Sequence, residues 1–323
     1  MSPTTEATSA PTDRSLPDTR RPRILVLMND AAGGGRAGGL DGEIALLGDE
    51  RALDLTIRRV PGPNLTTEAA AAATSGAWDI LVAAGGDGTV GAVAGAVAGT
   101  EVALGVLPLG TLNHFAKDLG LPLDLAGAIG VLAAANRRSV DVAEVNGRCF
   151  VNNSALGLYP ALVVDRDQQR RHRRRNKWIA YGVAALRMAF RFPLLRIGVR
   201  CHGMADGLSA IETPLIFIGN NKYRMNLLAF GSRTKLTGGL LSVYLIKRRS
   251  RLGMLGLLAA GLVGRLNQAR DFESYQVDTV EIAARRGRMR VSLDGEVHIM
   301  RPPLTYRSRP GALTVVVPSL PPS

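Results

Sequence analysis

A glycine-rich turn that follows a short apolar strand is the feature that most constrains this chain. Residues Ile80 to Ala84 form a continuous apolar run, which is typical of a strand buried on both faces. The next residues are Gly85-Gly86-Asp87-Gly88-Thr89, and glycines there can bring successive backbone N–H groups into one concavity. The apolar stretch Val90 to Ala98 is predicted to be a helix, whose N-terminus would also favour an anion. The turn therefore predicts a phosphate site, although a strand-to-helix turn that binds nothing would have the same sequence.

Asp87 lies in the middle of this turn, where a bare phosphate would repel its carboxylate. Phosphoryl-transfer sites offset such repulsion with a divalent cation. Asp87 therefore indicates a divalent cation, or a water molecule bound to one, between the carboxylate and the phosphate.

The segments on either side of the turn predict a parallel, doubly wound α/β domain. Apolar strands are expected at 24–28, 55–58, 80–84 and 102–107, with helices between them at 41–53, 66–74 and 90–98. Strands that alternate with helices over short connections favour a parallel sheet. Thr66 or Thr67 is expected to cap the second helix, and a glycine-rich turn that begins at Asn29 follows the first strand.

A second glycine turn, Pro108-Leu109-Gly110-Thr111-Leu112-Asn113, follows the strand at 102–107. Open α/β sheets bind ligands at the carboxyl ends of their parallel strands, so this turn is expected to face the first one. Thr111 and Asn113 could then offer side-chain hydrogen bonds to the same ligand. The alternative is a helix N-terminus with Thr111 as its cap.

From Val140 onward the pattern changes to antiparallel strands. Asn146-Gly147 between two apolar stretches is a strong hairpin signal. Further strands are expected at 194–202, 213–219, 240–246, 279–283, 289–293 and 313–317. A second domain dominated by antiparallel strands is therefore predicted to begin near Val140 or Phe150.

The formal net charge of +13 favours an anionic partner or surface. Nucleic acid, an anionic membrane and plain solubility could each account for it. Aromatic residues make up only 5% of the chain and do not interleave with the basic runs, so base stacking has little support and a membrane fits better. The two cysteines, Cys149 and Cys201, exclude a disulfide scaffold and favour a reducing compartment.

Two basic segments precede apolar stretches in the second half of the chain. They are Arg166 to Lys177, before the run at 178–192, and Lys247 to Arg251, before the run at 252–266. Both runs are too short and too interrupted to span a bilayer, but basic residues beside an apolar helix suit a peripheral membrane contact. Alternatively, both helices pack on the sheet and the arginines are solvated. Residues 1–23 lack an apolar segment and are predicted to be a disordered tail, not a signal peptide.

Asp294-Gly295-Glu296 is the second candidate for chemistry. Asp-Gly between alternating apolar residues is a common hairpin turn. A close pair of carboxylates can also accept the proton of a hydroxyl that attacks a phosphate. Both interpretations hold together if the tip of the hairpin aims the base.

Four motifs together resemble the bacterial diacylglycerol kinase-like lipid kinases, over nearly all of the chain from Ile24 to Val317. They are Gly85 to Thr89, Pro108 to Asn113, Val140-Asp141 and Leu293 to Glu296, in the order and spacing of that family. The resemblance implies an α/β nucleotide-binding domain at 24–143, to which a segment at about 302–318 returns. It also implies a C-terminal antiparallel β-sandwich at 144–301 that binds the lipid, with ATP and the lipid head held between the two domains.

The resemblance implies roles for individual residues. Asp87 would hold the Mg²⁺ of the nucleotide through a water molecule. Asp294 would be the general base that lets a lipid hydroxyl attack the γ-phosphate, and Glu296 would assist or replace it. ATP would be bound by residues of the two turns and the first strand: Asn29, Gly85, Gly86, Asp87, Gly88, Thr89, Gly110, Thr111 and Asn113. The implied protein is a cytoplasmic lipid kinase, peripheral at the inner membrane face and without a nucleic-acid partner. Exposed edges of its sandwich strands could pair in a homodimer.

The chain departs from the family pattern at four places. Asn29-Asp30 stands where the family usually has Asn-Pro, Gly91-Ala92 replaces Asn-Glu, and His114 replaces an aspartate. Leu236-Thr237-Gly238-Gly239 replaces Leu-Asp-Asp-Gly, so the structural Mg²⁺ site of some members is expected to be absent. The lipid stays open among diacylglycerol, a sphingoid base, another glycerolipid and a polyprenol. A soluble NAD kinase-like enzyme and a non-catalytic lipid- or nucleotide-binding relative also stay open.

Overall fold

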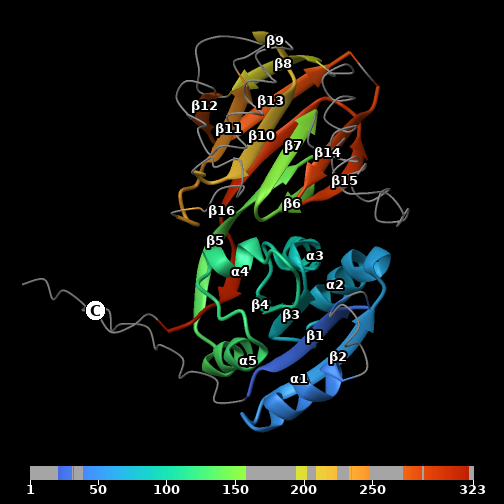
Figure 1. Ribbon diagram of the computed structural model, residues 1–323, viewed down its shortest axis with the longest axis vertical. Coiled ribbons are helices and arrows are strands. Elements are labelled where there is room, and N and C mark those ends of the chain that lie inside the picture. Colours follow the sequence, from blue (N-terminus) through green and yellow to red (C-terminus); the bar gives the residue numbers. More distant parts are fainter. Residues whose placement is uncertain are drawn as a thin grey trace, which may run out of the picture.

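Four parallel strands form the centre of the first half of the molecule (Figure 1). The computed structural model describes residues 21–30, 32, 39–157, 194–201, 209–223, 233, 235–246, 272–285 and 287–319. The strands are β1 (Arg23–Asn29), β2 (Asp54–Val60), β3 (Ile80–Gly85) and β4 (Ala103–Pro108), in the order β2-β1-β3-β4. Every residue of β3 and β4 is buried, as expected for a parallel sheet covered on both faces.

Helices cover this sheet in two pairs (Figure 1). On one side α1 (Leu40–Asp49) packs beside α5 (Leu125–Ala134), and on the other α2 (Leu65–Thr74) packs beside α3 (Asp87–Val97). A single turn, η1 (Gly62–Asn64), leads into α2, and the short helix α4 (His114–Asp118) follows β4. These layers confirm the predicted α/β domain.

The long strand β16 (Leu304–Val316) connects the two halves of the molecule. It pairs in parallel with β4 at Val315, and antiparallel with β5 (Arg137–Val145) and β13 (Thr279–Ala284). One ten-stranded sheet therefore continues from the parallel strands through β16 and β13 to β8 (Leu195–Cys201) and β9 (Ser209–Thr213). The strand β6 (Arg148–Phe150) pairs with β5 across a turn in which Asn146 and Gly147 have positive φ, so the predicted hairpin is confirmed.

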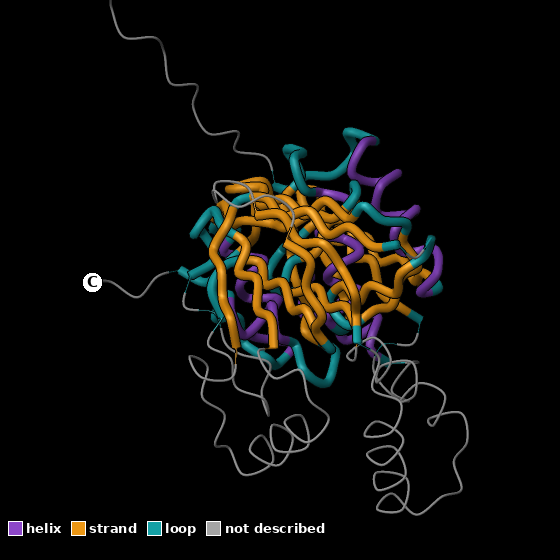
Figure 2. Tube along the Cα trace, turned by 90° about the horizontal axis from the view of Figure 1, so that it is seen from above, coloured by secondary structure: helices purple, strands orange, loops and turns teal. Residues whose placement is uncertain are grey.

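A second, six-stranded sheet packs against the far part of the first and completes a β-sandwich. Its strands run in the order β12-β11-β10-β7-β14-β15 and every neighbouring pair is antiparallel. They are β7 (Asn153–Gly157), β10 (Leu215–Asn220), β11 (Leu241–Ile246), β12 (Phe272–Val277), β14 (Met289–Leu293) and β15 (Glu296–Met300). Seen from above, the strands of the sandwich lie in front of the helices of the first half (Figure 2).

The apolar side chains form two cores that meet within β5. Val142 belongs to the core of the parallel sheet, whereas Ala143 belongs to the core of the sandwich. The strand β16 likewise contributes Tyr306 to the sandwich and Val315 to the parallel sheet. Two strands thus pass through both cores, which ties the two halves together.

Several local predictions were wrong at the ends of elements. The helix α3 begins at Asp87, not Val90, because Gly86 takes an extended conformation and serves as its N-cap. The N-cap of α2 is Asn64, so neither Thr66 nor Thr67 caps that helix, and α1 ends at Asp49. The alternative in which Thr111 caps the helix after the second turn does not hold, since the N-cap position of α4 is Asn113.

Other predictions missed an element or fall outside the described residues. The strands β9 and β12 lie in stretches for which no strand was predicted. Arg23 was predicted to belong to the N-terminal tail, but it begins β1, and its backbone N–H donates to Asp79 Oδ2 at 2.8 Å. The basic segments at 166–177 and 247–251 and the apolar runs after them lie outside the described residues, as do residues 1–20 and most of the turn after Asn29. None of the helices that the structure describes is long and apolar enough to cross a bilayer.

Candidate active site

The first glycine turn ends in an uncapped helix N-terminus. Gly85 ends β3, and Gly86, which is the N-cap of α3, has no side chain with which to cap the N–H groups of the first helical turn. Thr89 is buried below the turn, where its side chain touches Gly85 and its hydroxyl accepts a hydrogen bond from Asn29 Nδ2 at 3.4 Å. Thr89 and Asn29 therefore support the turn from its buried side and leave the backbone amides open to an anion.

The second glycine turn lies against the first, as the positions of the two parallel strands require. The N–H of Leu109 donates to the carbonyl of Gly85 at 3.1 Å. A β carbon on Gly86 would stand 3.5 Å from the α carbon of Gly110, and one on Gly110 would collide with the α carbon of Gly86. A β carbon on Gly86 would make only an ordinary van der Waals contact, whereas one on Gly110 would collide with backbone, so position 110 requires glycine.

Asn113 shapes the second turn from within. It has a positive φ of 50°, and its side chain is bonded to the turn itself: Oδ1 accepts the N–H of Gly110 at 3.1 Å, and Nδ2 donates to the carbonyls of Pro108 and Gly110 at 3.1 and 2.9 Å. Thr111 is exposed beside it. Of the two side chains predicted to bond a ligand here, only that of Thr111 faces solvent.

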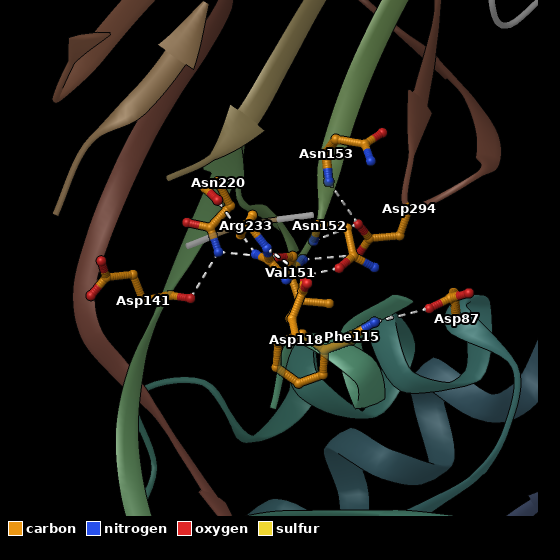
Figure 3. A network of polar contacts seen from close by, with 10 residues as sticks. All are labelled: Asp87, Phe115, Asp118, Asp141, Val151, Asn152, Asn153, Asn220, Arg233 and Asp294. Atoms are coloured by element: carbon orange, nitrogen blue, oxygen red, sulfur yellow. Dashed lines mark hydrogen bonds and ion pairs between the residues drawn. The ribbon is translucent and has the colours of Figure 1, made fainter. Parts of the chain in front are cut away.

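Asp87 connects the first turn with α4. As the first residue of α3 it is half-buried, and its Oδ1 accepts the N–H of Phe115 at 3.4 Å (Figure 3). His114, where the family usually has an aspartate, is the first residue of α4.

The tip of the β14–β15 hairpin reaches the N-terminal half of α3. Asp294 and Gly295 both have positive φ, which confirms the predicted hairpin turn. The Glu296 carboxylate lies against Gly88, and Asp294 Oδ2 lies 3.0 Å from where a β carbon on Gly91 would stand. The structure therefore brings both carboxylates of the second motif to the helix that carries Asp87.

The Asp294 carboxylate is held by three backbone amides. Its Oδ2 accepts the N–H of Val151 at 2.8 Å, and its Oδ1 accepts those of Asn152 and Asn153 at 2.7 and 3.1 Å (Figure 3). Burial raises the pKa of Asp294 to about 6, although these amides and the charge of Arg233 oppose the rise. A carboxylate with this pKa is mostly ionised near neutral pH and can still accept a proton.

Arg233 is the main polar residue of the site that the sequence did not identify. Its side chain is fully buried and forms an ion pair with Asp118 of α4, with 2.7 Å between Nε and Oδ2. The same guanidinium donates to Val151 O and Asn152 Oδ1. The polar stretch around Arg233 reads as a surface loop, so no local pattern reveals this burial.

Asp141, from the third motif, bonds to backbone amides of two other segments. It is buried, and its carboxylate accepts the N–H groups of Gly239 and Gly311 at 2.7 and 2.8 Å. Asn221 Oδ1 accepts the N–H of Gly238 at 2.8 Å. The side chains of Asp141 and Asn221 therefore hold the segment 236–239, which stands where the family has Leu-Asp-Asp-Gly.

The first turn offers one carboxylate, that of Asp87, to a magnesium ion. In the described residues, no three His, Cys, Asp or Glu side chains gather into a set that could hold a metal alone. Mg²⁺ needs only one or two carboxylates when phosphates and water supply the other oxygens. Asp87, at the start of α3, meets that requirement.

Known proteins match this chain over nearly its whole length. A probable lipid kinase, YegS-like, from Pseudomonas aeruginosa is 30% identical over 276 residues, which are 84% of this chain and 86% of that protein. The chain belongs to the diacylglycerol kinase-like lipid kinase family. The family models that match are the diacylglycerol kinase catalytic domain, over residues 23–145, and the YegS C-terminal NAD kinase beta sandwich-like domain, over residues 160–317.

A further relative agrees with this membership, and a solved structure shares the fold. A diacylglycerol kinase from Staphylococcus saprophyticus is 40% identical over 96 residues, which are 29% of this chain and 31% of that protein. The crystal structure of a diacylglycerol kinase from Bacillus anthracis superposes with a TM-score of 0.66 at 19% identity, and covers 93% of this chain and 98% of that one. At that identity the superposition supports the fold alone.

Proposed function

We propose that this protein transfers the γ-phosphate of ATP to a lipid hydroxyl, with diacylglycerol or a sphingoid-like lipid as the acceptor. The observation that supports this most is the approach of the Asp294 and Glu296 carboxylates to the helix N-terminus that begins at Asp87. A phosphate at that N-terminus would lie beside a group that can take the proton of an attacking hydroxyl. Membership in a lipid kinase family makes a lipid the acceptor of choice.

The backbone of the two turns would bind the nucleotide. Amides of the first turn of α3 point toward an anion, and the contact between Gly86 and Gly110 leaves no side chain to block it. Asp87 would hold Mg²⁺ through a water molecule, and the ion offsets phosphate charge when it is bound. Asn29, Thr89 and Asn113 maintain the shape of the turns.

Asp294 would act as the general base. A carboxylate has about four lone pairs in all. Among the described residues Oδ2 accepts the Val151 amide alone, so a lone pair of Oδ2 is left for a proton. That oxygen is also the one that faces α3. As the lipid oxygen bonds to the γ-phosphorus, its proton passes to Oδ2, the bond from the γ-phosphorus to the bridging oxygen breaks, and ADP leaves. No phosphoenzyme is required.

A peripheral contact with an anionic membrane, on the cytoplasmic face, would give the enzyme its substrate. The net charge of +13 supports attraction to anionic lipids. Binding to vesicles that contain anionic lipid should then weaken with salt and with neutralisation of Arg170 to Arg175. Vesicle binding that is unaffected by both changes would contradict this part of the proposal.

The test is transfer of labelled γ-phosphate from ATP to a panel of lipids in mixed micelles with Mg²⁺. A labelled lipid that disappears with both Asp87→Ala and Asp294→Ala supports the proposal and names the lipid class. Labelled NAD instead would favour a soluble NAD kinase-like enzyme. Bound ATP without any labelled product would favour a non-catalytic lipid- or nucleotide-binding relative.

A further inference from the structure

Arg233 lies at the junction of the two halves and uses its whole guanidinium there. Nε donates to Asp118 Oδ2 at 2.7 Å, Nη2 donates to Asn152 Oδ1 at 3.0 Å, and Nη1 donates to Val151 O and, at 3.4 Å, to Asn220 O. The side chain has no exposed surface. Only the planar fork of an arginine can meet acceptors in these different directions at once.

Two aromatic rings enclose the same guanidinium. Its central carbon lies 5.8 Å from the ring centroid of Phe115 and 5.5 Å from that of Tyr223. Phe115 belongs to α4 of the first half, and Tyr223 follows β10 of the sandwich. Arg233 is therefore held by both halves, through rings as well as through hydrogen bonds.

The segment 151–153 lies between Arg233 and Asp294. Arg233 binds the carbonyl of Val151 and the side chain of Asn152, while Asp294 accepts the N–H groups of both residues (Figure 3). Asp294 also donates its own N–H to the carbonyl of Asn153 at 2.9 Å. The orientation of the Asp294 carboxylate thus depends on a segment that Arg233 holds from the other side.

Arg233 is connected to Asp87 as well, through α4. It binds Asp118 at the end of that helix, and Phe115 at its start donates to Asp87. The helix is only one turn long, so fixing its last residue restrains the first. A single buried side chain therefore joins the supports of both candidate catalytic carboxylates.

We propose that Arg233 is a positioning residue that holds Asp294 in place as the general base and couples it to the turn that carries Asp87. This inference rests on the proposed kinase function. A buried ion pair can also have a purely structural role, because removal of one partner leaves an unpaired charge. The experiment must therefore measure more than stability.

The charge of Arg233 supplies a readout that packing alone does not. Among the described residues, the titratable and charged groups that interact with the Asp294 carboxyl are Arg233, Tyr223 and Cys149 of β6, with Asp118 behind Arg233. Glu296 follows on the same hairpin with its carboxylate against Gly88 of α3, and α3 presents Gly91 to Asp294 itself. Arg233 is the one cation in this set, and it favours the ionised form of Asp294. Removal of the Arg233 charge should therefore raise the pKa of Asp294. Removal of an arginine elsewhere in the protein should leave that pKa unchanged.

The test compares three variants: Arg233→Lys, Arg233→Met, and a double variant that combines Arg233→Met with Asp118→Asn. The double variant is used if Arg233→Met fails to fold, because it leaves no unpaired carboxylate at position 118. Arg309→Met is the matched control, because Arg309 pairs with Glu144 at 3.5 Å between β16 and β5 and makes no contact with Asp294. The measurements are thermal unfolding, ATP affinity, kcat with the lipid, and the ¹³C carboxyl titration of Asp294, assigned by its loss in Asp294→Asn.

We expect the folded Arg233 variants to bind ATP like the wild type and to lose kcat by at least about tenfold. The Asp294 midpoint should rise from about 6 in the Met variants and stay in place in Arg309→Met. Wild-type kcat and an unmoved midpoint in folded Arg233 variants would overturn the inference. If the wild type phosphorylates no lipid but the midpoint still moves, the kinase proposal fails while the control of Asp294 by Arg233 stands.

Discussion

Asp294 Oδ2 lies over Gly91 of α3, only 3.0 Å from where a β carbon on that glycine would stand. The family usually has asparagine at this position, so the smaller residue here gives the carboxylate space to approach the helix. This close approach, and not the hairpin turn alone, places Asp294 against the N-terminal half of α3.

Substitution of Gly91 should therefore separate stability from activity. Alanine is a better helix former than glycine by about 0.5–1 kcal/mol, so Gly91→Ala should unfold within about 1 kcal/mol of the wild type. Its methyl group should displace Asp294 and lower kcat by about tenfold or more. Gly42→Ala in α1, where nothing lies within 4 Å of the added carbon, is the control and should keep full activity. Equal kcat in both variants would show that Asp294 tolerates displacement.

The activity should fall in acid with a midpoint near pH 6. Burial raises the pKa of Asp294 to about 6, and only the ionised carboxylate can accept the proton of the lipid hydroxyl. The measurement is kcat/KM for the lipid from pH 5 to 8 at saturating ATP and Mg²⁺. Glu296→Gln removes the neighbouring carboxylate and should keep this midpoint, whereas its disappearance in that variant would assign the base to Glu296.

The same carboxyl group should make the protein less stable as the pH rises from about 4 to 6. The pKa of Asp294 is raised from its ordinary value of 3.8, so the folded state holds a proton in this range that the unfolded chain has released. Urea unfolding of wild type and Asp294→Asn across this range isolates the effect. The difference between the two proteins should change with pH, and a constant difference would contradict the raised pKa.

The contact between the two glycine turns should not tolerate a side chain. Gly110→Ala places a methyl group against the backbone of Gly86, so the turns must separate, which we expect to cost about 1–3 kcal/mol and most of the ATP affinity. Gly130→Ala in α5 is the control, because only Arg51 Nε comes within 4 Å, at 3.9 Å. Unchanged ATP binding by Gly110→Ala in calorimetry would place the nucleotide elsewhere.

The segment 236–239 should be stable without a metal. Asp141 accepts the amides of Gly239 and Gly311 with both carboxylate oxygens, so Asp141→Asn turns an NH₂ group toward an N–H donor and should cost about 1–3 kcal/mol. Asp124→Asn at the N-cap of α5 is the control, since asparagine caps equally well. EDTA should leave the unfolding temperature of the nucleotide-free protein unchanged. A drop with EDTA would indicate a cation that the segment needs.

The sequence by itself determined the parallel sheet, the glycine turns and the hairpin tips. Each depends on neighbours along the chain: an apolar run long enough for a buried strand, glycines where the backbone must approach another backbone, and Asn-Gly or Asp-Gly where φ is positive. Ends of helices were less well predicted, because the extended conformation of Gly86, which sets the start of α3, has no sequence signal of its own.

Only the tertiary structure decided what surrounds the candidate base. The bonds of Asp294 to Val151 and Asn152 join residues more than a hundred positions apart, and Arg233 pairs with Asp118 over a separation of 115. Burial of a charge depends on the side chains that enclose it from several elements, not on its neighbours in sequence. For the same reason, the passage of one sheet through both halves along β16 appears only when strands far apart in the chain are paired.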